Sequence, residues 1–128
     1  MTDLTDRRLN TLQPDPSWIP AGFDDDLAVL DNDAHTFRVW GGDWCSDCRQ
    51  QLPAFGAALA ELDVPESRVH DYPVEKADDG SKMGEQVEAY DVERIPTVVV
   101  EADGEEVARF VESADRPIVA ELARQLRA

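Results

Sequence analysis

The stretch FRVWGGDWCSDCRQQLPAF, residues 37–55, contains both cysteines of the chain, Cys45 and Cys48, with two residues between them. It begins with a short apolar run, passes two glycines, and continues with leucine and phenylalanine at helical spacing. This order predicts a strand at residues 37–40, a turn, and a helix over about residues 45–62 that begins at the cysteines.

Two cysteines at this spacing are compatible with three kinds of chemistry. In a redox dithiol, Cys45 would lie at the helix N-terminus, where unpaired N–H groups favour a thiolate, and Cys48 would lie on the same face. A zinc site needs two more ligands and would have to recruit His35 and His70, which have no companion ligand nearby in the sequence. A pair of inert buried thiols would not explain the glycines and the aspartate that precede the helix. The dithiol, with Cys45 as nucleophile and Cys48 as resolving thiol, is the favoured interpretation.

The rest of the chain shows alternating helix and strand patterns. Further helices are expected at residues 3–13, 23–30, 83–90 and 115–127. Further strands are expected at residues 67–74, 97–101 and 106–112, the last two joined by a hairpin turn. Asp115 is the expected N-cap of the last helix, with Pro117 in its first turn. This order predicts an α/β fold with a mixed sheet covered by helices on both faces.

Length and composition limit the class of protein. A chain of 128 residues with 42% hydrophobic content can form one core, so we expect a single domain over residues 1–128 in which residues 1–20 are a helical extension. The sequence has no apolar run of about 18 residues and no apolar signal segment at its start, which predicts a soluble cytoplasmic protein. The net charge of −16 would repel nucleic acid and anionic membranes, so neither is an expected partner.

The acidic residues are spread along the whole chain, and its only lysines are Lys76 and Lys82. This composition resembles that of proteins from salt-loving archaea, whose cytoplasm is rich in potassium chloride. Salt at about 1 M shortens the Debye length to roughly 3 Å and screens repulsion between carboxylates. We therefore expect a halophilic protein.

Three motifs, in this order, resemble those of the thioredoxin superfamily. They are Trp44-Cys45-Ser46-Asp47-Cys48 after a strand, Pro53 within the following helix, and Ile95-Pro96-Thr97 at the start of a strand. The resemblance covers about residues 37–128 and implies a thioredoxin-like three-layer fold, with a central mixed sheet flanked by helices. It also implies that Pro96 is cis and faces the dithiol, that Ile95 pairs with an extended substrate through its backbone, and that Trp44 supplies an apolar flank.

Three departures from the family pattern bear on the site. Ser46 and Asp47 replace the usual Gly-Pro between the cysteines, and we expect them to tune the redox couple. Val39 stands where many members carry a buried aspartate that accepts the resolving cysteine's proton. Glu112 or Ser113 replaces a glycine after the final strand, which would narrow or acidify the substrate groove.

The sequence therefore predicts a cytosolic thiol-disulfide oxidoreductase acting on protein or low-molecular-weight disulfides. The product would be a Cys45–Cys48 disulfide that an external reductant, such as a thioredoxin-reductase-like enzyme, returns to the dithiol. We expect a monomer that needs no bound cofactor and no metal. The alternative is a non-catalytic binding module or redox sensor that holds partners in the groove beside Pro96.

Overall fold

The computed structural model describes residues 9–79, 81–112 and 116–127. The helices are η2 (Asn10–Leu12), α1 (Asp24–Leu30), α2 (Ser46–Glu61), η3 (Glu66–Arg68) and α3 (Ile118–Arg127). The strands are β1 (His35–Gly41), β2 (Val69–Pro73), β3 (Glu75–Lys76), β4 (Lys82–Met83), β5 (Thr97–Ala102) and β6 (Glu105–Val111). No described helix is long and apolar enough to cross a membrane.

Four of the strands form a mixed central sheet in the order β2-β1-β5-β6. The pair β1/β2 is parallel, whereas β1/β5 and β5/β6 are antiparallel. The central strand β5 is covered on both faces, because the consecutive residues Val98, Val99 and Val100 are all 0% exposed. The mixed sheet and its helices confirm the predicted fold class.

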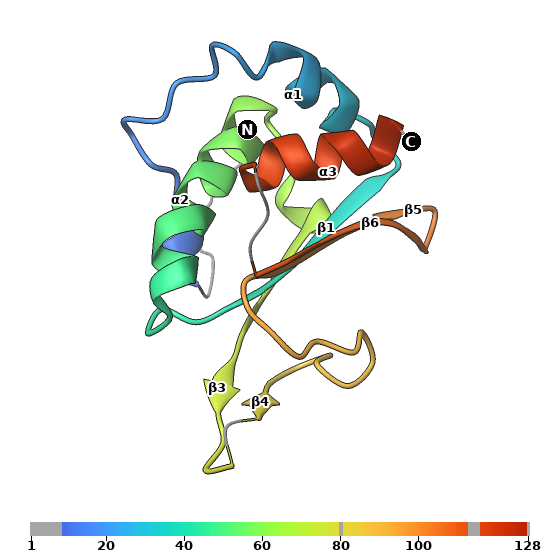
Figure 1. Ribbon diagram of the computed structural model, residues 1–128. Coiled ribbons are helices and arrows are strands. Elements are labelled where there is room, and N and C mark those ends of the chain that lie inside the picture. Colours follow the sequence, from blue (N-terminus) through green and yellow to red (C-terminus); the bar gives the residue numbers. More distant parts are fainter. Residues whose placement is uncertain (1–8, 80, 113–115, 128) are drawn as a thin grey trace.

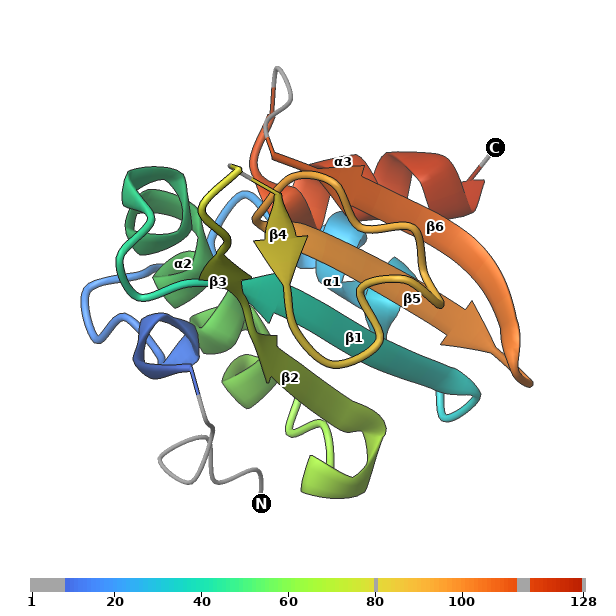
Figure 2. The same cartoon turned by 90° about the horizontal axis from the view of Figure 1, so that it is seen from below.

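The two faces of the sheet are covered differently. Helices α1, α2 and α3 all lie on one face (Figure 1). The segment between β2 and β5, which includes the short antiparallel pair β3/β4, crosses the opposite face (Figure 2). The prediction of helices on both faces is therefore wrong for the described residues: the second face is covered by the segment between β2 and β5 instead.

The helix predicted at residues 83–90 is not formed. Met83 belongs to β4, and residues 84–91 form turns in which Gln86 and Asp91 have positive φ angles of 63° and 58°. Tertiary contacts fix this path, because the Trp40 indole N–H donates to the Glu85 carbonyl at 3.0 Å. A local apolar spacing typical of a helix is therefore overridden by contacts with the sheet.

A polar and aromatic cluster joins this segment to the sheet. The Arg38 guanidinium donates to the Glu101 carboxylate and to the Tyr72 hydroxyl, both at 2.6 Å, and the Tyr90 hydroxyl donates to Glu101 at 2.7 Å. The Trp40 ring packs against both tyrosines, with centroids 5.0 Å apart. Burial raises the pKa of Glu101, but the hydrogen bonds from Arg38 and Tyr90 outweigh it and leave this pKa lowered. The carboxylate is therefore held in its charged form.

The beginning of the described chain packs against α2. Residues 10–12 form the 3₁₀ helix η2, whereas residues 3–8 of the predicted helix lie outside the described residues. The Leu12 carbonyl oxygen lies so close to Gly56 that an added Cβ would be 1.9 Å from it. Glycine at position 56 is thus what lets the two backbones meet.

From β5 onward the chain follows the prediction closely. A turn at Asp103 and Gly104, with φ angles of 54° and 85°, connects β5 and β6 as the predicted hairpin. Helix α3 follows Pro117, whose carbonyl accepts the Glu121 N–H at 2.9 Å, so Pro117 directly precedes the first turn. The predicted N-cap, Asp115, lies outside the described residues.

Candidate dithiol site

The turn between β1 and α2 positions the two cysteines. Cys45 has extended backbone angles of φ −88° and ψ 122° and occupies the N-cap position of α2. Its N–H donates to the Gly42 carbonyl at 3.0 Å, and its own carbonyl accepts the Arg49 N–H at 3.0 Å. A Cβ on Gly41 would lie 2.8 Å from Leu52 Cδ1, so glycine permits the end of β1 to approach α2. The first sulfur is thus held where the helix begins.

The two thiols have unequal surroundings. Both cysteines are free, but Cys45 is half-buried and Cys48 is 0% exposed. The Gly42 N–H donates to Cys48 Sγ at 3.5 Å. Burial raises the pKa of Cys48 to about 12; the Gly42 N–H opposes this rise, whereas Cys45 and the Asp47 charge add to it. At neutral pH the buried thiol therefore stays protonated.

The Ile95–Pro96 turn lies beside the first sulfur. Its peptide bond is cis, and the Cys45 thiol is 4.0 Å from the Ile95 carbonyl oxygen. The Thr97 hydroxyl donates to the Arg94 carbonyl at 2.6 Å and closes the turn. Cys45 and Ile95, which are 50 residues apart in the sequence, are therefore neighbours in the fold.

Trp44 forms one side of the site. Its side chain is 48% exposed, and its indole N–H donates to the Val74 carbonyl at 3.0 Å. The indole lies against Gly42, where a Cβ would be 2.6 Å from Nε1. Gly42 therefore makes room for the Trp44 indole. One apolar face of this indole stays open to solvent.

The positions that depart from the family pattern can now be placed. Ser46 and Asp47 are exposed in the first turn of α2. Glu112 has a φ angle of +57°, its N–H donates to the Pro96 carbonyl at 2.7 Å, and its carbonyl accepts the Gln51 amide at 2.7 Å. Glu112 therefore occupies the conformation that favours glycine, next to the cis-proline turn, whereas Ser113 lies outside the described residues.

Two carboxylates near the dithiol were not identified from the sequence. Asp43 accepts the N–H groups of Asn10 and Thr11 at 3.3 and 3.0 Å, which ties η2 to the turn that carries the cysteines. Asp71, 4% exposed, lies opposite the buried Val39 in the β1/β2 register and accepts the Leu9 N–H at 2.7 Å. The strand itself, Val-His-Asp-Tyr-Pro, gives no sequence signal that distinguishes Asp71.

The histidines weighed as zinc ligands have other surroundings. His35 is buried at the start of β1, where its Nδ1 lies 3.0 Å from the Leu30 carbonyl oxygen. His70 is paired with Arg38 in the β1/β2 register. Within the described residues, no three histidine, cysteine, aspartate or glutamate side chains are grouped as metal ligands would be.

Comparison with solved structures identifies the same architecture in known proteins. A mutant thioredoxin from Halobacterium salinarum is 25% identical, with a TM-score of 0.51 and coverage of 78% of each chain. Mitochondrial thioredoxin 3 from Saccharomyces cerevisiae in its oxidised form is 13% identical, with a TM-score of 0.52 and coverage of 82% of this chain and 88% of that one. No protein-family model matches the sequence, and no curated protein matches it significantly.

The fold and the spaced cysteine pair define a thioredoxin-like protein. This chain is a member of the thioredoxin-like superfamily, as the resemblance of its motifs implied.

Proposed function

We propose that this protein is a cytosolic thiol-disulfide oxidoreductase that reduces protein or low-molecular-weight disulfides. The observation that carries the proposal is the unequal pair of thiols at the start of α2, one half-buried beside the Ile95–Pro96 turn and one fully buried. A nucleophile that meets substrate and a shielded thiol that attacks later are the two parts that disulfide exchange requires.

In the first step, Cys45 as thiolate attacks one sulfur of the substrate disulfide. The substrate S–S bond breaks, a mixed disulfide forms at Cys45, and the departing sulfur takes the electron pair and then a proton. The N–H groups at the start of α2 favour the attacking thiolate, because they place partial positive charge there.

In the second step, Cys48 loses its proton and attacks Cys45 Sγ. The second substrate sulfur leaves as a thiolate, and a Cys45–Cys48 disulfide remains. The raised pKa of Cys48 keeps this thiol protonated while both cysteines are reduced. Two electrons from an external dithiol reductant, such as a thioredoxin-reductase-like enzyme, then restore the reduced protein.

Substrate would occupy the surface between Trp44 and the cis-proline turn. The exposed indole offers an apolar contact, and an extended segment would pair with the backbone at Ile95. Asp47 is exposed in the first turn of α2, and the Glu112 N–H bonds to the Pro96 carbonyl, so we expect the charges of these two residues to disfavour acidic substrate segments. We propose a monomer that works without a bound cofactor or metal.

The test is an insulin reduction assay with a chemical reductant as electron source. We expect turnover by the parent protein, none by Cys45→Ser, and accumulation of mixed disulfides on Cys48→Ser. Binding of disulfide partners without turnover would contradict the proposal and support a non-catalytic binding module.

Alkylation tests the role of each cysteine separately. In the reduced protein, an iodoacetamide time course followed by mass spectrometry should modify Cys45 well before Cys48, because only Cys45 is accessible to solvent. Unfolded protein is the control, since burial no longer separates the two thiols there. Equal rates in the folded protein would contradict the assignment.

A further inference from the structure

An apolar pocket of about 530 Å³ lies on the helical face of the molecule, between α2, α3 and the segment that precedes α1. Its volume falls within the range of roughly 300–1,000 Å³ typical of small-molecule sites. Neither cysteine lines it. Gln51, which lines the pocket, donates to the Glu112 carbonyl beside the cis-proline turn, so the pocket adjoins the dithiol surface without including either sulfur.

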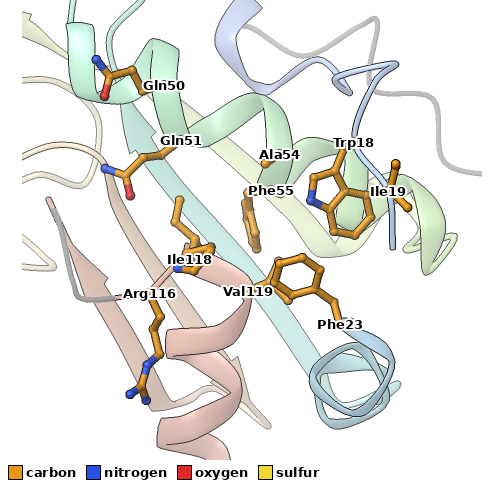
Figure 3. Close-up of a pocket in the computed structure, with 11 residues that line it drawn as sticks. Trp18, Ile19, Phe23, Gln50, Gln51, Ala54, Phe55, Arg116, Ile118 and Val119 are labelled. Atoms are coloured by element: carbon orange, nitrogen blue, oxygen red, sulfur yellow. The ribbon is translucent and has the colours of Figure 1, made fainter. Parts of the chain in front are cut away.

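The side chains of the pocket are segregated by polarity (Figure 3). Trp18, Ile19 and Phe23 lie at one end, and Gln50, Gln51 and Arg116 lie at the other. Phe55, Ile118 and Val119 lie between the two ends. This arrangement suits an elongated amphiphile with its apolar body at the aromatic end. Its polar head would lie at the other end, where the Gln51 amide already donates to the Glu112 carbonyl and the Arg116 side chain points away from the apolar residues.

The apolar end is largely pre-formed. Phe55, Ile118 and Val119 are 1–3% exposed and belong to the core, so the floor of the pocket is fixed by packing. The Trp18 and Phe23 rings pack against each other with centroids 5.6 Å apart. Ile19 is 67% exposed at the rim, where a bound apolar chain would cover it.

The charge at the polar end indicates the sign of the head group. Among the described lining residues Arg116 alone is charged, in a chain whose net charge is −16. Arg116 contributes to the lowered pKa of Glu121, but the hydrogen bonds to that carboxylate come from Arg124 and Gln125. The first turn of α3 already carries one carboxylate, Glu121, and this group is paired with Arg124 at 2.6 Å.

We propose that this pocket binds a small amphipathic carboxylate, with its hydrocarbon body between Trp18, Phe23 and Phe55 and its carboxylate at Arg116. An acidic protein attracts cations non-specifically, so a preference for an anion would have to come from a built site. The proposal uses neither thiol and is therefore independent of the reductase activity.

The test compares three probes that share one hydrocarbon tail: octanoate, 1-octanol and octylammonium. Binding is measured by calorimetry and by amide chemical shifts, in potassium chloride at about 1 M. We expect octanoate to bind best and to shift the Trp18 indole and the start of α3. Tighter binding of octylammonium, shifts located elsewhere, or no binding of octanoate would overturn the proposal.

Variants locate the two ends of the site. Arg116→Gln should lower the affinity for octanoate by roughly 3- to 5-fold and leave the affinity for 1-octanol unchanged, as expected for the loss of one solvent-accessible ion pair. Arg127→Gln, which removes the same charge from the far end of α3 outside the pocket, is the control and should change the binding of neither probe. A loss of octanoate affinity equal in both variants would show a general charge effect and contradict the site.

Ala54→Trp should fill the pocket and abolish binding of both octanoate and 1-octanol. If this variant does not fold, Ile19→Ser serves in its place, because the side chain is exposed and its replacement disturbs no core contact. Unchanged affinity in a folded pocket variant would overturn the proposal.

Discussion

The mouth and the floor of the dithiol site are built from different kinds of structure. The mouth consists of Trp44, Cys45, Pro96 and Glu112, which lie in irregular backbone with an N-cap, a cis peptide bond and a positive φ angle. The floor consists of Gly41, Cys48 and Leu52 in regular strand and helix, together with Leu9. Cys48, Leu52 and Leu9 are all at most 1% exposed.

This difference explains why two neighbouring cysteines have different surroundings. Their spacing places both sulfurs on one turn of α2, but only the floor excludes water. Burial raises the pKa of Cys48 to about 12, whereas Cys45 faces the mouth. The asymmetry of the pair is therefore a property of packing rather than of the motif.

The largest expected effect comes from a cavity in the floor. Leu52→Ala should lower the free energy of unfolding by about 2–5 kcal/mol, because Leu52 is 0% exposed and packs where β1 meets α2. Denaturant unfolding measures this loss. Gln50→Ala, at an exposed position of the same helix, is the control and should stay within about 0.5 kcal/mol of the parent. A loss below about 1 kcal/mol for Leu52→Ala would show that the floor is not tightly packed.

Salt should act on the charged surface and leave the floor unchanged. A like-charge pair 4 Å apart costs about 1 kcal/mol in water, and a chain of net charge −16 contains a few such pairs. Because potassium chloride at about 1 M screens them, the free energy of unfolding should rise by roughly 2 kcal/mol. Thermal melts from low to multimolar salt measure the gain, and the Leu52→Ala penalty should not change with salt. A melting temperature independent of salt would contradict the halophilic assignment.

The pH dependence of stability should report the burial of Cys48 at alkaline pH. Because the pKa of Cys48 is raised from 9.0 to about 12 on folding, its contribution is fully present below pH 9 and is lost as the pH rises towards 12. Burial also raises the pKa of Tyr90, so the measurement is the difference between the parent and Cys48→Ala. An identical alkaline loss of unfolding free energy in both proteins would contradict the burial of this thiol.

In the mouth, Gly42→Ala should displace the Trp44 indole. The new Cβ would lie 2.6 Å from Nε1, and the hydrogen bond to Val74, worth about 0.5–1.5 kcal/mol, should be lost. The indole N–H signal in a proton–nitrogen NMR spectrum should move towards its solvent-exposed position. Trp44→Phe removes the same hydrogen bond without adding a Cβ and identifies the signal. An unmoved signal in Gly42→Ala would show that the indole does not rest on this glycine.

The smallest expected effect is at Glu112. Its φ angle of +57° favours glycine, so Glu112→Gly should relieve strain, partly offset by the greater freedom of the unfolded chain, for a net gain of at most about 1 kcal/mol. Glu112→Ala removes the carboxylate but keeps the Cβ, and it should bring no such gain. Equal stability of the two variants in denaturant unfolding would assign any change to charge rather than to backbone conformation.

Local pattern was sufficient where chain neighbours decide the conformation. The apolar spacing from Leu52 to Leu59 predicted α2, and the turn at Asp103 and Gly104 predicted the hairpin. It was not sufficient at residues 83–90, where Trp40 and the sheet hold the backbone in turns. The anchoring roles of Asp43 and Asp71 could not be predicted from the sequence either, because each carboxylate accepts hydrogen bonds from N–H groups more than 30 residues away.

The sequence by itself determined the fold class, the paired cysteines at the start of α2, and the placement of Ile95–Pro96 before a strand, because each follows from residue types and their spacing along the chain. Only the tertiary structure decided which thiol is buried and that Glu112 adopts the positive φ angle beside Pro96. The physical reason is that burial and backbone strain depend on what packs around a residue. At this site the neighbours come from η2, β1, β6 and the Ile95–Pro96 turn.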